Sequence, residues 1–398
     1  MDRRAFLRGS AIAAAGFALT PVALKLAQSG RDAGDGGVRH RDVDGVRSGR
    51  ARPVGYGPLG DPDANGIRLP RGFSSRVIAT SGAALAGYVW HAAPDGGATF
   101  ALADGGWIYV SNSEVSGAGG AGSVRFNAAG EIVSAQRVLG GTNRNCAGGP
   151  TPWGTWLSCE ELEGGRVFEC DPLGRREAIE RPALGFFVHE AAAVDVERGH
   201  VYMTEDRGDG RFYRFTPTAA GDLSDGALDV ARVGAGGSVS WRPVPAPNPA
   251  AGETPTRAQV SASTAFNGGE GAWYAGGHVY FTTKGDNRVW DYDCVGGTVG
   301  VLYDAATAAD PILRGVDNVT AAANGDLYVA EDGGDMQLVR IEPGGEVSAF
   351  LGVTGQDGSE ITGPAFSPDG TRLYLSSQRG GTGSGITYEI AGPFKELP

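Results

Sequence analysis

A repeat of about 47 residues is the feature that most restricts the fold of this 398-residue chain. Each unit has a turn rich in Gly, Asp or Pro, followed by a short strand-like segment such as Trp107-Ile108-Tyr109-Val110. The aromatic residues at the centres of these segments are Tyr109, Trp156, Tyr202, Tyr280, Tyr328 and Tyr374, at intervals of 47, 46, 78, 48 and 46 residues. Such a period is typical of β-propeller blades, which are four-stranded sheets around a central channel. We therefore expect an all-β, six-bladed β-propeller.

The composition supports this fold class and excludes several others. Glycine accounts for 67 of 398 residues, against a usual ~7%, which suits short strands joined by tight turns. The hydrophobic fraction of 41% is ample for a core, so the chain is neither disordered nor collagen-like. A formal net charge of −12 leaves no basic surface for a phosphate backbone, so we expect no nucleic-acid binding.

The first thirty residues have the pattern of an export signal. Arg3 and Arg4 form a twin-arginine pair, and the apolar segment 11–24 that follows is shorter than the ~20 residues needed to span a bilayer. We expect residues 1–30 to be a twin-arginine (Tat) signal peptide. The Tat translocase would then export the protein to the periplasm or the extracellular space, with no stable membrane anchor.

The rest of the chain divides into two parts. Residues 31–69 are rich in Gly, Asp and Arg without periodicity, which indicates a linker or an extended arm, and residues 70–398 hold the repeats. Residues 1–30 carry four basic and one acidic side chains, so the remainder has a net charge of −12 − 3 = −15. The predicted propeller domain is strongly acidic.

Two details of the propeller can be predicted. The 78-residue interval contains an insertion, and the proline-rich segment Trp241 to Pro255 is its expected position, as a surface loop. Propellers usually close by completing one blade with a strand from the other end of the chain, which hides a pair of sheet edges. We expect the segment from Phe73 to Ala79 to pair with the segment from Ile386 to Ile390.

In a propeller blade, the start of the innermost strand and the end of the second strand lie on the same face, around the channel mouth. The predicted starts of the innermost strands carry His91, Cys146, His189, Glu190, Glu270, Asp317, Asn318, Glu360 and Thr362. The predicted ends of the second strands carry Asn112, Glu114, Glu160, Glu161, Glu205, Asp206, Lys284, Glu331, Asp332, Gln378 and Arg379. Carboxylates predominate in both sets.

A single carboxylate at a strand end is usually solvated or caps a turn. About eight of them at one mouth would repel each other and raise one another's pKa values unless cations neutralised their charge. Oxygen ligands favour calcium, whereas the thiolate of Cys146 favours a transition metal such as iron. The sequence therefore predicts a mixed metal site at the channel mouth.

Several segments together resemble the PhoX-type alkaline phosphatases. They are Asn145-Cys146-Ala147-Gly148-Gly149, Thr151-Pro152-Trp153-Gly154-Thr155-Trp156, Cys159-Glu160-Glu161, His189-Glu190-Ala191-Ala192, Thr204-Glu205-Asp206-Arg207 and Asp317-Asn318. The resemblance extends over most of residues 70–395, and the segment from the cysteine to the paired glutamates is its most specific part. It implies a monomeric, Tat-exported propeller with Fe³⁺ and Ca²⁺ ions at the channel mouth, which hydrolyses small phosphate monoesters.

The resemblance also implies roles for individual residues. Cys146 corresponds to a thiolate that bridges two irons, and carboxylate ligands correspond to Glu161, Glu190, Asp206 and Glu270. Further candidate metal ligands are Glu160, Asp317, Asn318 and Glu331, and the candidate catalytic residues are Glu270, Lys284 and Arg207. The metals would activate the attacking oxygen, so no serine or threonine nucleophile is required.

One position departs from the family pattern. Gly268 stands two residues before Glu270, where the resemblance leads us to expect an arginine that contacts phosphate. Lys284, Arg207 or Arg379 could replace it, because each follows a predicted second strand beside the channel. Lys284 is the best substitute, although it could equally serve as a partner for the acidic residues.

Other assignments stay open at this stage. Cys159 and Cys170 could form a disulfide, whereas Cys146 is assigned to metal. His91 and His189 could each bind a metal or make structural hydrogen bonds. The alternative to a phosphatase is a propeller with a structural metal site, or a lactonase-type hydrolase, although Cys146 argues against the lactonase type.

Overall fold

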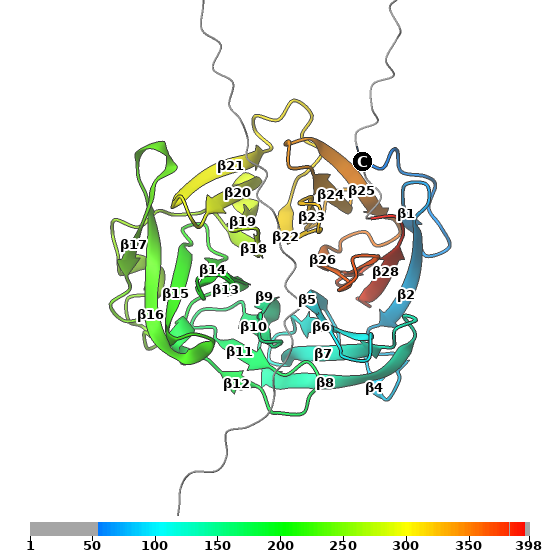
Figure 1. The fold of residues 1–398 in the computed structure, drawn as a ribbon, viewed down its shortest axis with the longest axis horizontal. Coiled ribbons are helices and arrows are strands. Elements are labelled where there is room, and N and C mark those ends of the chain that lie inside the picture. Colours follow the sequence, from blue (N-terminus) through cyan, green and yellow to red (C-terminus); the bar gives the residue numbers. More distant parts are fainter. Residues whose placement is uncertain (1–54, 382, 395–398) are drawn as a thin grey trace, which may run out of the picture. The chain divides into compact units, whose positions relative to one another are not determined.

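The computed structural model of the protein describes residues 55–381 and 383–394, and these residues form six sheets arranged around a central channel (Figure 1). The predicted signal peptide and most of the predicted arm lie outside the described residues. The predicted class is confirmed, since the fold is an all-β six-bladed propeller. No helix in the described ranges is long and apolar enough to cross a membrane.

The first three blades follow one another along the chain. Blade 1 consists of β5 (Pro94–Ala101), β6 (Trp107–Ser113), β7 (Gly119–Phe126) and β8 (Ile132–Thr142). Blade 2 consists of β9 (Asn145–Pro150), β10 (Trp156–Glu160), β11 (Val167–Cys170) and β12 (Ile179–Glu180). Blade 3 consists of β13 (His189–Val194), β14 (Val201–Glu205), β15 (Phe212–Ala219), β16 (Asp222–Val233) and β17 (Val239–Pro243).

Two of the other three blades, blades 5 and 6, include a strand from the start of the described chain. Blade 4 consists of β18 (Gly269–Ala275), β19 (His278–Thr283), β20 (Arg288–Asp293) and β21 (Thr298–Asp304). Blade 5 consists of β22 (Val316–Ala321), β23 (Leu327–Glu331), β24 (Gln337–Ile341), β25 (Val347–Val353) and β1 (Ile67–Arg68). Blade 6 consists of β26 (Ile361–Phe366), β27 (Arg372–Ser377), β28 (Ile386–Ala391) and β2 (Ser74–Thr80).

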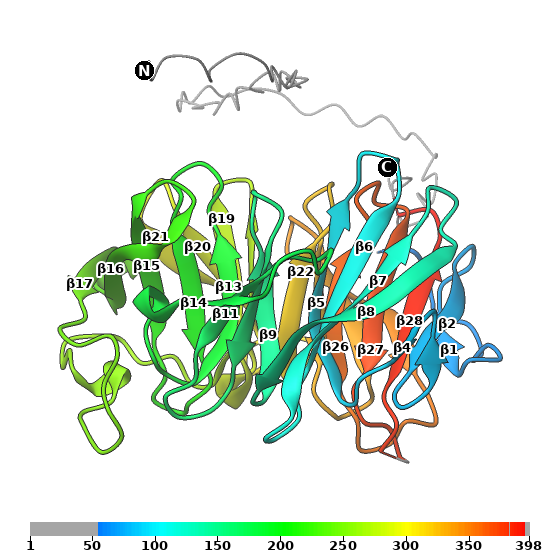
Figure 2. The same ribbon diagram turned by 90° about the horizontal axis from the view of Figure 1, so that it is seen from below.

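The small elements lie in the connections. A hairpin of β3 (Ala84–Leu85) and β4 (Tyr88–Val89) precedes blade 1. Four short 3₁₀ turns occupy loops: η1 (Pro182–Leu184), η2 (Ala235–Gly237), η3 (Thr256–Ala258) and η4 (Lys284–Asp286). Seen from the side, the blade strands run between the two faces of the propeller (Figure 2).

The aromatic residues that defined the repeat occupy equivalent places. Tyr109, Trp156, Tyr202, Tyr280, Tyr328 and Tyr374 lie on β6, β10, β14, β19, β23 and β27, the second strand of each blade. Five of them are buried and Tyr280 is partly buried, in apolar clusters that join neighbouring sheets. One such cluster stacks Tyr109 of blade 1 on Tyr374 of blade 6, with ring centroids 5.0 Å apart. The repeat therefore encodes the packing between blades.

Glycine is needed where the innermost strands approach the channel. A Cβ on Gly149 of β9 would overlap the carbonyl oxygen of Ala192 on β13. A Cβ on Gly271 of β18 would likewise overlap the backbone of Asn318 on β22. Backbones of adjacent blades touch at these positions, so a larger residue would force the blades apart.

The predicted closure is confirmed. β2 pairs antiparallel with β28, from Ser74 opposite Ala391 to Thr80 opposite Ile386. The propeller extends further toward the N-terminus than predicted, because β1 adds to the outer edge of β25 and buries Ile67. The described part of the predicted arm, residues 55–69, is thus part of the fold.

The predicted surface loop at Trp241 to Pro255 is wrong in its first residues. Trp241, Arg242 and Pro243 belong to β17, which pairs with the long strand β16 and adds a fifth strand to blade 3. The edge of β16 would otherwise expose unpaired backbone groups, and Trp241 packs against Tyr202 and Tyr292. The loop proper follows β17 (Figure 2).

We predict that Tyr374→Phe destabilises the closing blade. The Tyr374 hydroxyl accepts a hydrogen bond from Trp107 Nε1 at 3.0 Å and donates one to Glu389 at 2.9 Å. Its removal leaves a buried indole N–H unpaired, so the free energy of unfolding should fall by about 1–3 kcal/mol. Denaturant titration measures this change.

Tyr388→Phe is the matched control on the neighbouring strand. The Tyr388 hydroxyl is buried without a hydrogen-bond partner, so its removal should change stability by less than about 0.5 kcal/mol. Equal losses of stability in the two variants would contradict the role assigned to the Tyr374 hydrogen bonds.

Candidate metal centre at the channel mouth

The acidic residues at the channel mouth come from the starts of the innermost strands. Asp95, Cys146, Glu190, Glu270 and Asp317 lie near the starts of β5, β9, β13, β18 and β22. Each lies where the register between the first and second strands of its blade is interrupted. A β-bulge re-aims a side chain at the end of a strand. Bulges in five blades thus place a thiol and four carboxylates at one mouth.

Side chains of the preceding blade hold these bulges in position. Asn112 Nδ2 donates to the carbonyl oxygen of Cys146 at 3.1 Å. The hydroxyl of Thr204 donates to the carbonyl of Glu270 at 2.5 Å, and that of Thr282 donates to the carbonyl of Asp317 at 2.5 Å. The ligand residues are therefore fixed by contacts between blades, as a preorganised site requires.

Three groups of side chains are close enough to hold a metal ion. They are Cys146, Glu161 and Glu190; Glu190, Glu270 and Asp317; and Asp317, Asp332 and Glu360, each with ligand atoms within 4.8 Å of one another. Glu190 belongs to the first two groups and Asp317 to the last two. The groups therefore form one continuous series across the mouth, which we call the acidic series.

Ionisation of all the carboxyl groups in the acidic series is electrostatically unfavourable. Burial and the neighbouring carboxylates raise the pKa values of Glu190 and Glu270 well above the ordinary range. Burial raises the pKa of Glu161 to about 8 despite Arg144, and burial with Asp317 and Asp332 raises that of Glu360 to about 8. Bound cations would offset this cost.

The donor atoms fit the predicted metals. Glu270 Oε1 is buried, and Lys284 Nζ pairs with it at 2.9 Å. The group with Cys146 combines a thiol with two carboxylates, which suits a transition metal. The other two groups offer only carboxylate oxygens, which suit a hard cation such as calcium.

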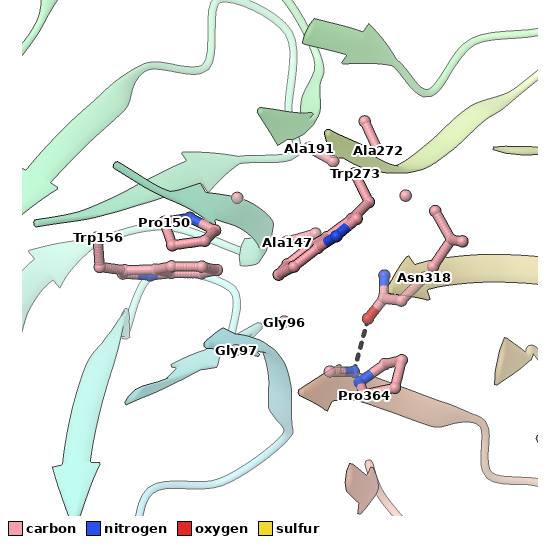
Figure 3. Close-up of a pocket in the computed structure, with 14 residues that line it drawn as sticks. Gly96, Gly97, Ala147, Pro150, Trp156, Ala191, Ala272, Trp273, Asn318 and Pro364 are labelled. Atoms are coloured by element: carbon pink, nitrogen blue, oxygen red, sulfur yellow. Dashed lines mark hydrogen bonds between the residues drawn. The ribbon is translucent and has the colours of Figure 1, made fainter. Parts of the chain in front are cut away.

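Five of the predicted ligands lie in the acidic series: Cys146, Glu161, Glu190, Glu270 and Asp317. Asp206 lies beside it, where its charge raises the pKa values of both Glu161 and Glu270. Asn318 has a different task, because its Nδ2 donates to Asp317 and its Oδ1 accepts from Gly363 N at 2.7 Å (Figure 3). Its amide orients Asp317 and joins blade 5 to blade 6.

Glu160 and Glu331 do not belong to the acidic series. The two carboxylate oxygens of Glu160 accept hydrogen bonds from the backbone N–H groups of Asn143 and Arg166. Those of Glu331 accept from the N–H groups of Arg314 and Gln337. Both carboxylates brace loops around the mouth through these hydrogen bonds, and their assignment as ligands stays a prediction.

The three predicted catalytic residues do not all lie in the acidic series. Glu270 lies in the acidic series, and Lys284 joins it, with its Nζ 2.9 Å from Glu270 and 3.2 Å from Asp332. Although burial opposes it, Asp317 and Glu270 hold the pKa of Lys284 above its usual value. Arg207 instead pairs with Glu163 at 3.0 Å, which leaves it outside the acidic series.

Gly268 cannot easily be an arginine in this chain. Its φ of +70° lies in the left-handed region, where a side chain is strained. Its N–H donates to the backbone carbonyl of Arg207, and its own carbonyl accepts from the backbone N–H of Lys284, which fixes this conformation. The local backbone conformation therefore disfavours an arginine at this position.

His91, His189 and the cysteines other than Cys146 lie outside the acidic series. Burial lowers the pKa values of His91 and His189 to about 3, and His189 Nε2 lies 2.9 Å from the carbonyl of Gly185. All four cysteines are free. The open possibility of a disulfide is excluded by register, because Cys159 pairs with Val167 whereas Cys170 pairs with Trp156.

Some residues of the site were missed or not selected from the sequence. Asp95 was not among the predicted residues of the mouth, although it lies in the bulge of β5 with its carboxylate 3.6 Å from Cys146 Sγ. Glu360 and Asp332 were noted at the mouth but not selected as ligands. They occupy places in the repeat that are equivalent to those of predicted ligands, and this equivalence was the sequence signal that could have identified them.

Below the acidic series, the channel is narrow and lined mainly by small residues. Gly96, Ala147, Ala191, Ala272 and the ring of Trp273 lie around it, as seen in Figure 3. The site is therefore approached from the mouth side.

Comparisons with known proteins agree with this geometry. The family description "Alkaline phosphatase PhoX" matches residues 96–291 and 282–381. The structure of Pseudomonas fluorescens PhoX in complex with vanadate, a transition state analogue, superimposes with a TM-score of 0.70 at 17% identity, covering 84% of this chain and 97% of that chain. No curated protein matches this chain.

A second solved structure shares the fold more distantly. It is a structural genomics protein of unknown function from Bacteroides thetaiotaomicron, with a TM-score of 0.50 at 11% identity, covering 80% of this chain and 76% of that chain. The family match over residues 96–381 favours the phosphatase prediction over the lactonase alternative. It spans more than half of the sequence, and the chain therefore belongs to the PhoX alkaline phosphatase family, which makes it a phosphoric monoester hydrolase.

Proposed function

We propose that the protein hydrolyses small phosphate monoesters at the channel mouth, with iron and calcium ions held by the acidic series. The observation that supports this most is the sharing of Glu190 and Asp317 between three groups of ligands, of which one contains the thiol of Cys146. Shared carboxylates are suited to hold several cations close together. The family to which the chain belongs supplies the reaction class.

The residues present can be assigned roles in this reaction. Cys146, Glu161 and Glu190 would hold iron, and the groups that contain Asp317 would hold calcium. Bound cations would polarise the phosphoryl group and neutralise its charge. Lys284, a cation between Glu270 and Asp332, would orient these carboxylates and attract the phosphate dianion to this side of the mouth.

The N-terminal segment supports a proposal about location. The twin-arginine pair and the short apolar segment 11–24 favour export through the Tat translocase to the periplasm or beyond. Since Tat exports folded proteins, the metals could be bound before export. We propose that the mature protein acts there as a monomer.

The assay of an aryl phosphate at alkaline pH tests the function. The iron- and calcium-loaded wild type should turn the substrate over, and Glu190→Gln should lower kcat/KM by about 10²-fold or more, because it neutralises a ligand shared by two groups. Glu177→Gln, at an exposed position, is the control and should retain activity. A loaded wild type without turnover would contradict the proposal.

Elemental analysis tests the division of ligands between metals. Cys146→Ala should lower iron per chain while calcium stays near the wild-type level, because the two groups that contain Asp317 are intact. Cys294→Ala is the matched control, since this free cysteine lies beside Gly277, at the turn between β18 and β19 on the opposite face. Unchanged iron in the Cys146 variant would refute the assignment.

Metal removal should make stability depend on pH. Without metal, Glu161 and Glu360 have pKa values of about 8, above their usual value, so the stability present at acidic pH is lost as pH rises through about 8. Bound cations would hold these carboxylates ionised and suppress the loss. The Tm of chelator-treated protein should therefore fall more steeply between about pH 5 and pH 9 than that of loaded protein. Parallel Tm profiles would contradict this account.

A further inference from the structure

Two arginines at the mouth share one buried carboxylate. Arg144 Nε lies 3.1 Å from Glu114 Oε1, and the guanidinium of Arg379 pairs with Glu114 Oε2. Gln378 Nε2 donates to Glu114 Oε2 as well, at 3.1 Å. Glu114 therefore fixes two guanidinium groups that come from different blades, since Arg144 precedes β9 and Arg379 follows β27.

The two guanidinium groups also reach both ends of the acidic series. Arg144 Nη2 lies 2.5 Å from Glu161, and Arg379 Nη1 lies 2.7 Å from Glu360. A guanidinium has five N–H donors, and these ion pairs use only some of them. Each arginine therefore retains donors for an anion beside the candidate metal ligands.

The backbone at Arg144 is unusual. Its φ of +46° lies in the left-handed region, which is uncommon for a residue other than glycine. Such strain persists where the surroundings hold the residue in place, and it is concentrated at functional sites. The side chain of Arg144 is thus held at the mouth against the preference of its backbone.

Both arginines line an open pocket beside the acidic series. Its other walls are Glu114, Ala92, Ala93, Val115, Ser116 and Gly383. The side chains of Arg144 and Arg379 are 38% and 46% exposed, so they are accessible from this pocket. Small uncharged residues form the remaining walls, which suits a compact neutral organic group.

We propose that Arg144 and Arg379, oriented by Glu114, bind the phosphoryl oxygens of the substrate, and that this pocket receives the organic group of the ester. The inference rests on the proposed phosphatase function and names the side from which the substrate enters. Guanidinium groups bind phosphate oxygens through paired hydrogen bonds. Arg144 and Arg379 supply the positive charge of the arginine that the family pattern has at position 268, where the left-handed backbone of this chain disfavours a side chain.

Kinetics of loaded Arg144→Gln and Arg379→Gln test the phosphate contact. Each variant should raise KM for phenyl phosphate, and the inhibition constant of inorganic phosphate, by about ten- to hundredfold with a smaller effect on kcat. Glu114→Gln should raise both constants as well, because it frees the two guanidinium groups. Arg125→Gln is the matched control: Arg125 is 41% exposed and pairs with Asp104, at the turn between β5 and β6 on the opposite face.

A separate variant tests the pocket. Ala92→Phe fills it from an exposed position, so KM for phenyl phosphate should rise while inhibition by inorganic phosphate stays unchanged. Equal effects on both ligands, or on neither, would overturn the assignment of the pocket to the organic group.

The outcomes separate this inference from the proposed function. An active wild type whose arginine variants keep the wild-type KM and phosphate inhibition would overturn the inference alone. Variants that lose metal or stability but keep the phosphate inhibition constant would show that the arginines only neutralise the acidic series, which also overturns it. An inactive loaded wild type would instead contradict the proposed function, and phosphate binding by calorimetry would still test the arginines.

Discussion

The close approach of the innermost strands is the constraint on which the rest of the structure depends. Adjacent blades touch through their backbones, so that a Cβ at Gly149 or Gly271 would collide with the next blade. Strands this close must carry small residues in the channel, and their larger polar residues are confined to the ends. The bulges at those ends turn Glu190, Glu270 and Asp317 toward the mouth. The geometry that closes the propeller therefore also assembles the site.

The site concentrates buried carboxylates whose charges repel one another. Six elevated carboxyl pKa values, those of Asp95, Glu161, Glu190, Glu270, Asp317 and Glu360, show how unfavourable their joint ionisation is without metal. Lys284, Arg144 and Arg379 offset part of this repulsion. The structure is thus prepared for cations before any bind, since neighbouring blades rather than the metal hold Cys146, Glu270 and Asp317 in position.

The sequence was sufficient for the fold because the packing is periodic. The aromatic residue of each second strand lies between blades, so its spacing reports the blade count directly. The insertion and the arm were less predictable, because edge strands such as β17 and β1 have no repeat partner. Their pairing depends on which sheet edge is left open.

Adjacent acids at the site point in different directions because side chains alternate along a strand. Two adjacent acids at a second-strand end have different roles, as in Glu160-Glu161 and Glu331-Asp332. The first residue accepts hydrogen bonds from backbone amides, and the second faces the mouth. Composition cannot distinguish adjacent acids, but a shift of one residue reverses the direction of the side chain. Comparing the pairs between repeats would have separated them.

The positive charges at the mouth come from two kinds of position in a blade. Lys284 and Arg379 follow second strands, as Glu161 and Asp332 do, whereas Arg144 precedes an innermost strand. Gly268 carries no cation, because its left-handed backbone is fixed by hydrogen bonds to the backbone of Arg207 and Lys284. The positive charge at the mouth therefore comes from other positions. Arg144 has a left-handed backbone and lies at the same mouth. The ligands of the acidic series thus coexist with a separate set of positive side chains, and this second set is the part of the site that can change with the substrate while the propeller stays the same.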